Sequence, residues 1–289
     1  MGAVTRRSSM LDDSTLEERA SPFRALYEHW ETTQWAAHKL DLSTDTATFR
    51  SLDEPEQAGM VWIFAHRFHA EFGVARLLAP FLAAAPDYEM QLMLATQVAD
   101  EYRHLQSVLR VYDEVFGVHG GIEAVQELAD QNMDPVAEML YDALDGRVLA
   151  LREDPAPETF SRAVFAYHCI AEGVVARTAQ NLAAGQYERH GFPGLAAGQK
   201  LVARDEARHI GIGVSFLRRE MQRDRELTFA AVTDVVEEFG RLAERGLEFG
   251  RDLEEELRDG YGVDSNAFYA EAMRLFQIRL RSIGYLDDD

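Results

Sequence analysis

The stretch VARDEARH at residues 202–209 places Glu206 three positions before His209, and EYRH at 101–104 repeats that spacing with Glu101 and His104. Residues three apart share one face of a helix, so each pair can direct a carboxylate and an imidazole at one point. Roughly one such pair is expected by chance in a chain of this length, so their sequence context has to carry the argument.

Two further glutamates complete a pattern. Glu71 lies 30 residues before Glu101, and Glu172 lies 34 residues before Glu206, both in apolar surroundings. A carboxylate on a buried helix face is costly unless it is paired or bound to metal. The order Glu, Glu-x-x-His, Glu, Glu-x-x-His on four successive helices is the ligand set of a ferritin-like di-metal carboxylate bundle. Four carboxylates and two imidazoles suit two iron or manganese ions.

The rest of the chain also has a helical pattern, with no alternating strand pattern of useful length. We therefore expect an all-α protein, a ferritin-like four-helix bundle with extra helices at both ends. Residues 21–289 would form one domain, preceded by a loose segment at 1–20. The long helices are predicted near 57–85, 88–116, 159–184 and 195–222, with further helices near 226–259 and 265–283.

Composition excludes several partners. The chain has 29 basic and 50 acidic side chains, a net charge of −21, which argues against nucleic acid and anionic membrane surfaces. No apolar run approaches the ~20 residues of a membrane span. Cys169 is the single cysteine, and the N-terminus lacks the apolar core of a signal peptide. These features predict a cytoplasmic protein without membrane insertion.

Asp205 directly precedes Glu206. Histidines that bind metals usually donate their second N–H to a carboxylate, so Asp205 is a candidate for orienting His104 across the bundle. The alternative is a surface ion pair between Asp205 and Arg208.

The segment 202–209 resembles the second motif of ribonucleotide reductase small subunits, and WAAHKLDLS at 35–43 resembles their N-terminal tryptophan segment. The resemblance spans about residues 25–250. It implies electron transfer as one role for Trp35, with core packing as the alternative. Val108 stands where the radical tyrosine of that subunit would be, and little tail is left to dock a large subunit.

The chain is more similar to the ligand-binding oxidases related to that small subunit. In that family a valine three residues after the first ligand and a tyrosine five before the third-helix glutamate form an ether cross-link. Val74 and Tyr167 occupy those positions. Five residues span ~500° of an α-helix, so Tyr167 and Glu172 would share a face only across a π-bulge.

The resemblance implies a mixed manganese/iron centre, or alternatively two irons, that activates O2 for two-electron C–H oxidation near a bound long-chain fatty acid. It assigns manganese to Glu71, Glu101 and His104, and iron to Glu172, Glu206 and His209. It also allows a homodimer.

Three alternatives stay open. The first is a reductase small subunit that lacks the tyrosyl radical, and the second is a biosynthetic di-iron oxygenase. Some of those oxygenases carry a third histidine one turn before the last Glu-x-x-His, where this chain has Val202. The third is a non-enzymatic metal-storage bundle, for which the long segment after Gln222 would be unneeded.

Overall fold

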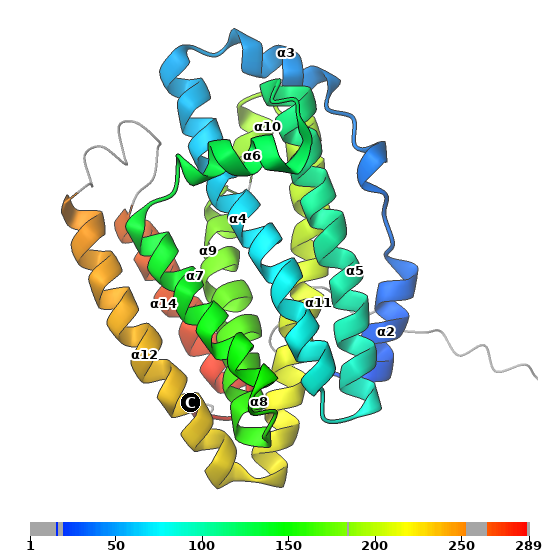
Figure 1. The fold of residues 1–289 in the computed structure, drawn as a ribbon, viewed down its shortest axis with the longest axis vertical. Helices are drawn as coiled ribbons and strands as arrows, with labels where there is room; N and C mark the ends of the chain where they lie inside the picture. The colour runs from blue at the N-terminus through cyan, green and yellow to red at the C-terminus, as the bar shows by residue number, and fades with distance from the viewer. Residues whose placement is uncertain (1–15, 17–19, 184, 253–264, 288–289) are drawn as a thin grey trace, which may run out of the picture.

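Four long helical rods form the centre of the molecule (Figure 1). This computed structural model describes Leu16 and residues 20–183, 185–252 and 265–287, and within that part of the chain every regular element is a helix. The rods are α4 (Glu54–Ala84), α5 (Tyr88–Arg110), the segment from 157 to 183, and α11 (Pro193–Arg223). The predicted all-α bundle is confirmed.

Two of these rods begin at an aspartate whose side chain caps the first turn of the helix. Asp53 caps α4, where it accepts from the Glu56 N–H at 2.9 Å while the Glu56 carboxylate accepts from the Asp53 N–H at 3.1 Å. Asp87 caps α5 in the same way, by accepting from the Met90 N–H at 2.8 Å. Each cap satisfies backbone donors that the first turn of a helix leaves without partners.

The third rod changes its winding near the middle. It begins as α8 (Pro157–Val164), continues as the π-helix η4 (Phe165–Ala176) and ends as α9 (Arg177–Ala183). A π-helix pairs residues five apart, so Tyr167 and Glu172 come to one side of the rod. The looser winding that Tyr167 and Glu172 would need to share a face is present, and it extends over more than one turn. A second π segment, η2 (Val111–Phe116), closes α5.

Additional helices flank the bundle on both sides in sequence, as predicted. α2 (Phe23–Thr32) packs on α5 and α11, while α12 (Arg225–Asp252) and α14 (Ser265–Ser282) stand against the third rod. The connecting elements are η1 (Ala37–Lys39), α3 (Ser43–Ser51), α6 (Gly121–Asp130), α7 (Pro135–Leu149), η3 (Ala150–Arg152) and α10 (Gln186–Arg189).

Two predicted segments lie wholly or partly outside the described residues. Of the loose segment 1–20, only Leu16 and Ala20 are described, and Leu16 is fully buried in the core. Residues 253–259 of the helix predicted near 226–259 are likewise outside them. The single domain over 21–289 stays a prediction.

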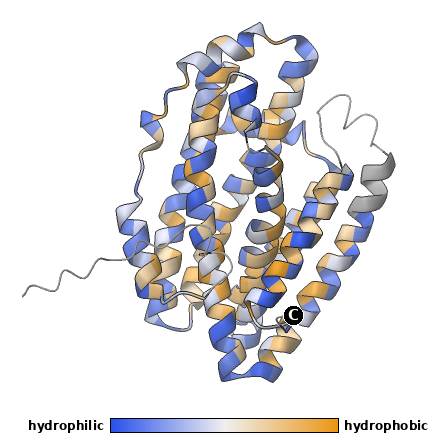
Figure 2. Cartoon of the chain, turned by 180° about the vertical axis from the view of Figure 1, so that it is seen from behind, coloured by the Kyte–Doolittle hydropathy of each residue, from blue (hydrophilic) through white to orange (hydrophobic). Residues whose placement is uncertain are grey.

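Hydrophobic and hydrophilic residues alternate around the long helices (Figure 2), and the buried ones form two clusters. Phe64 and Phe68 of α4 belong to one cluster, and Leu77 and Phe81 of the same helix belong to the other. Glu71 lies between them along α4, so the candidate ligands are placed in a polar layer between two apolar ones. No described helix meets the length and hydropathy needed to cross a bilayer.

Candidate metal centre

The structure brings the six predicted ligands together at the middle of the bundle. Each is at most 7% exposed. Ligand atoms within 4.8 Å of one another form two groups, which we name position 1 and position 2. Position 1 consists of Glu71, Glu101, His104 and Glu206, and position 2 consists of Glu101, Glu172, Glu206 and His209.

Glu101 and Glu206 belong to both positions. The sequence assigned each of them to one metal, whereas the geometry lets each carboxylate serve both, one oxygen per side. At position 2, His209 Nδ1 lies 3.1 Å from Glu101 Oε1 and 3.3 Å from Glu206 Oε2. At position 1, His104 Nδ1 lies 3.3 Å from Glu101 Oε2 and 3.4 Å from Glu206 Oε1. The two positions are therefore adjacent and share two carboxylates, which could each hold both metals.

Both histidines are turned the same way. Their Nδ1 atoms face the glutamates, and their Nε2 atoms face aspartates: His104 Nε2 is 3.2 Å from Asp205 Oδ2, and His209 Nε2 is 3.2 Å from Asp100 Oδ2. A carboxylate at Nε2 favours the tautomer that carries its proton there, which leaves the Nδ1 lone pair for a metal.

Several inward-facing atoms lack hydrogen-bond partners among the described residues. They are His104 Nδ1, Glu101 Oε2 and Glu172 Oε2, all buried. Buried polar atoms are rarely left unpaired, and each such atom calls for an explanation. The donor set of oxygens and imidazole nitrogens fits iron and manganese, so the residues present fit a dinuclear metal group.

The pKa directions describe the same charge imbalance in the metal-free protein. Burial would lower the pKa of both histidines, but the surrounding carboxylates outweigh it and raise their pKa well above the usual value. Burial and the neighbouring Glu206 raise the pKa of Glu172 well above its normal range, and burial also raises that of Glu71. Burial opposes ionisation of Glu101 too, but the two histidines lower its pKa to about 2. Protons thus offset the excess negative charge that two divalent cations could otherwise balance.

Asp205 contacts His104 across the bundle, where the sequence placed it. Its Oδ2 also accepts from Trp35 Nε1 at 2.6 Å and from Arg103 Nη2 at 2.9 Å. The Trp35 ring stacks on the His104 ring with centroids 6.2 Å apart. The alternative pairing of Asp205 with Arg208 is not what the structure shows, because Arg208 instead donates to Asp100 at 2.6 Å.

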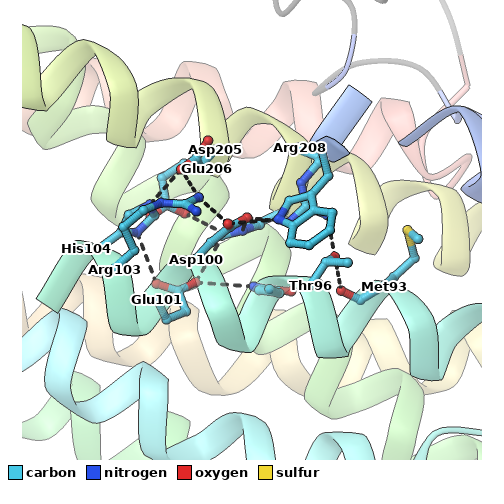
Figure 3. A network of polar contacts seen from close by, with 12 residues as sticks. Met93, Thr96, Asp100, Glu101, Arg103, His104, Asp205, Glu206 and Arg208 are labelled. Atoms are coloured by element: carbon cyan, nitrogen blue, oxygen red, sulfur yellow. Dashed lines mark hydrogen bonds and ion pairs between the residues drawn. The ribbon is translucent and has the colours of Figure 1, made fainter. Parts of the chain in front are cut away.

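Asp100 is the counterpart of Asp205, and the sequence analysis missed it. Asp100 is fully buried on α5 and contacts Arg208 and Arg103 (Figure 3). It also contacts His209, and its Oδ1 accepts from Trp30 Nε1 at 3.0 Å. The signal was available: DEYRH at 100–104 and DEARH at 205–209 repeat one pattern. Each aspartate orients the histidine of the other motif.

Gln97 and His168 were also missed. The Gln97 amide donates to Glu172 Oε1 at 2.8 Å, and its carbonyl oxygen lies 3.0 Å from His168 Nε2. Burial lowers the pKa of His168 to about 3, so this ring is neutral and can donate from Nε2. Gln97 thus holds Glu172 Oε1, and His168 fixes the orientation of the Gln97 amide. Neither residue has a sequence signal of its own, since only the fold brings them to Glu172.

Tyr167 lies close to the glutamates. It is fully buried, its hydroxyl has no hydrogen-bond partner among the described residues, and its ring packs edge-on to Phe81 at 5.4 Å. Burial raises its pKa well above normal, with all four glutamates adding to the effect. Val74 packs against the apolar cluster that contains Tyr167.

Val108, which stands where the radical tyrosine would be, lines a small, half-open pocket. A cavity of about 20 Å³ lies among Phe64, Arg67, Ser107 and Val108. That volume holds about one water molecule, so this cavity is not the place of a long-chain ligand. Val202, where some oxygenases carry a third histidine, is buried as an apolar side chain.

Known structures resemble this chain closely in fold. No protein-family model matches the sequence. An R2-like ligand-binding oxidase with an aerobically reconstituted metal cofactor after photoconversion superposes with a TM-score of 0.78 and 23% identity over 92% of this chain and 94% of that one. Two variants of such an oxidase with reconstituted Mn/Fe cofactors give TM-scores of 0.79 and 0.80 at 22% identity, covering 92% and 91% of this chain and 94% and 93% of theirs. The chain therefore has the ferritin-like helical fold of the R2-like ligand-binding oxidases.

Proposed function

We propose that the protein is a dinuclear metal oxidase. The observation that carries this proposal is the pair of adjacent positions, each with one histidine and three carboxylates and with two carboxylates shared. Manganese at position 1 and iron at position 2 is the preferred pair, and two irons are the alternative. When bound, such a pair supplies O2 activation for two-electron oxidation of a C–H bond.

The chain's own residues hold and shield the centre. Glu71 on α4 and Glu172 on η4 each serve one position, while Asp205 and Asp100 keep the two Nδ1 atoms pointing inward. The apolar clusters above and below the polar layer exclude water from it. A dry site strengthens every electrostatic interaction inside it and protects a strong oxidant from side reactions.

The proposed first product of this oxidant is an ether between Val74 and Tyr167. The bond would join a Val74 side-chain carbon to the Tyr167 oxygen, with loss of one C–H and one O–H hydrogen and with O2 as the electron acceptor. The absence of a hydrogen-bond partner for the buried Tyr167 hydroxyl among the described residues supports this, as does the π-helix that turns Tyr167 to the side of Glu172.

The substrate class proposed is apolar, with a long-chain fatty acid as the first candidate. The resemblance to ligand-binding oxidases supports it, and the structural relatives are themselves ligand-binding oxidases. A homodimer and a cytoplasmic location complete the proposal; the first rests on the family resemblance and the second on the sequence composition.

The test is an intact-mass spectrum and peptide map of protein loaded with Mn(II) and Fe(II) and exposed to air. We expect a loss of two hydrogens, about 2 Da, with the peptides of Val74 and Tyr167 joined. Tyr167→Phe should abolish the loss. Tyr112→Phe is the matched control, because Tyr112 is also fully buried with no hydrogen-bond partner for its hydroxyl among the described residues. Metal uptake without any mass change would contradict the cross-link.

One observation favours a second candidate. Trp35, Asp205 and His104 form a continuous hydrogen-bonded chain from the surface to position 1, as a radical-generating reductase subunit would need. Position 108, where the radical tyrosine would be, is a valine, so this candidate requires that the oxidising equivalent is stored on the metals. It predicts a tight complex with a large catalytic subunit, measurable by size-exclusion chromatography.

A further inference from the structure

Two tryptophans contact the candidate centre in the same way. Trp35 donates to Asp205, which contacts His104 of position 1; Trp30 donates to Asp100, which contacts His209 of position 2. Both tryptophans are partly exposed, whereas both aspartates are buried. Each series of hydrogen bonds thus joins the buried layer to the surface through an indole. Indoles, like the phenol of tyrosine, are among the side chains that lose one electron most readily.

The surroundings of the two indoles differ. The guanidinium of Arg103 lies over the Trp35 ring, 5.1 Å from its centroid. A cation on the ring face stabilises the neutral indole and opposes removal of an electron, because the oxidised ring is itself positive. Among the described residues no guanidinium or ammonium lies over the Trp30 ring in this way.

Trp30 has a second oxidisable ring as its neighbour. The Tyr27 ring centroid is 5.8 Å from that of Trp30, on the same helix α2. Tyr27 is partly exposed, and a hydrogen bond with the exposed Glu31 raises the pKa of its phenol. Glu31 can take the phenol proton when Tyr27 is oxidised, so Tyr27 is equipped to exchange an electron at the surface.

We infer that Trp30 and Tyr27 form the route by which electrons enter the protein. The route leads through Asp100 and His209 to position 2, and Trp35 takes no part in this electron transfer. The inference rests on the proposed function, which supplies the oxidant. The external partner is a one-electron reductant that meets α2 near Tyr27.

The electron count closes for each transfer. Trp30 gives one electron toward the oxidised centre and becomes an indole cation, whose N–H stays bonded to the Asp100 carboxylate. Tyr27 then returns one electron to Trp30 and passes its phenol proton to Glu31. The external reductant gives one electron to the Tyr27 radical, which recovers its proton from Glu31.

The test is rapid freeze-quench EPR on protein loaded with Mn(II) and Fe(II), mixed with O2 without any reductant. We expect an organic radical in the wild type, whose lines narrow when the protein carries ring-deuterated tyrosine. Tyr27→Phe should replace this signal by one that responds to deuterated tryptophan, whereas Tyr269→Phe, at a partly exposed tyrosine on α14, should leave it unchanged. Relative to the amount of oxidised metal in each sample, Trp30→Phe should lower the organic radical at least ~10-fold, and Trp35→Phe should change that ratio less than ~2-fold.

Oxidation of the metals, followed by absorbance in the same samples, separates the two proposals. Metals that oxidise without any tyrosine or tryptophan radical would overturn the route alone. A radical lost in Trp35→Phe and kept in Trp30→Phe would do the same, as would a tyrosine signal that survives Tyr27→Phe. Metals that never oxidise would overturn the proposed function and the route with it. Should Trp30→Phe not fold, the comparison of Tyr27→Phe with Tyr269→Phe still decides.

Discussion

Position 1 and position 2 are built from one repeated motif, DExRH, yet their surroundings differ. Glu71, the glutamate that belongs to position 1 only, lies on the regular helix α4, and the guanidinium of Arg67 is 3.7 Å from its carboxylate. Glu172, the glutamate that belongs to position 2 only, lies on a π-helix and accepts a hydrogen bond from the neutral amide of Gln97. Equal ligands therefore have unequal neighbours at the two positions: a cation beside Glu71, and a neutral amide and a π-helix at Glu172.

The largest effect is expected where the two positions are shared. Replacement of Glu101 or Glu206 by alanine removes a ligand from both positions, whereas Glu71→Ala removes one from position 1 only. We expect the first two variants to weaken both metals by roughly 100-fold or more, and the third to spare position 2. Metal content by inductively coupled plasma mass spectrometry after dialysis measures this.

The matched control is Glu220→Ala, since Glu220 is also 7% exposed on α11 but pairs with Arg219 and Arg223 instead of the centre. Two ions still bound in Glu101→Ala would refute the shared-bridge geometry.

The next effect separates the positions through their aspartates. Asp205→Asn should weaken the metal beside His104, and Asp100→Asn the metal beside His209, each by about 10- to 100-fold. Competition titrations with a metal-chelating dye give the two affinities. Asp87→Ala, which removes the cap of α5, should leave both unchanged while it lowers thermal stability. Equal losses at both metals in each variant would show that the halves are not separable.

The third comparison concerns how closely the helices that carry Glu71 and Glu172 are packed. A methyl group added at Gly213 would meet the Cβ of His168 at 2.3 Å, beneath the π-helix, whereas one at Gly73 on α4 meets nothing within 4 Å. We expect Gly213→Ala to lower the free energy of unfolding by about 1–3 kcal/mol, and Gly73→Ala to raise it by up to about 1 kcal/mol. Urea unfolding measures both, and similar values for the two would contradict the close packing at position 2.

The smallest effect is a gradual one with pH. The raised pKa of His104 and His209 means that their protonated forms stabilise the metal-free fold below the unfolded value near 6.5, and this is lost as pH rises through the folded values. The raised pKa of Glu172 acts in the same direction. The metal-free protein should therefore unfold at lower temperature at about pH 9 than at about pH 6.5, with a slope of at most about 1.4 kcal/mol per pH unit for each proton.

Metal-loaded protein provides the comparison, because bound metals replace those protons and their affinity rises with pH. A melting temperature of the metal-free protein that rises over the same interval would show that the sign is wrong.

The sequence predicted the bundle because its signals are local. Glu-x-x-His spacing, the two isolated glutamates in apolar stretches and the prolines at helix starts each act within a few residues. The π-helix could also be anticipated, since Tyr167 and Glu172 could share a face only if the helix were wound more loosely than an α-helix.

The missed residues depend on tertiary structure. An aspartate before Glu101 can equally well face solvent, and only the crossing of α5 and α11 directs Asp100 to His209. Gln97 and His168 meet across two rods separated by 71 positions in sequence. The shared role of Glu101 and Glu206 follows from distances that spacing along one helix does not contain.

The most direct test of the central claim is a crystal structure of the Mn(II)/Fe(II)-loaded protein with anomalous data at both metal edges. We expect two adjacent ions, one on His104 Nδ1 and one on His209 Nδ1, with Glu101 and Glu206 bound to both. Glu71 and Glu172 should each bind one ion only. A single ion, an ion bound through either Nε2 atom, or ions elsewhere in the bundle would contradict it.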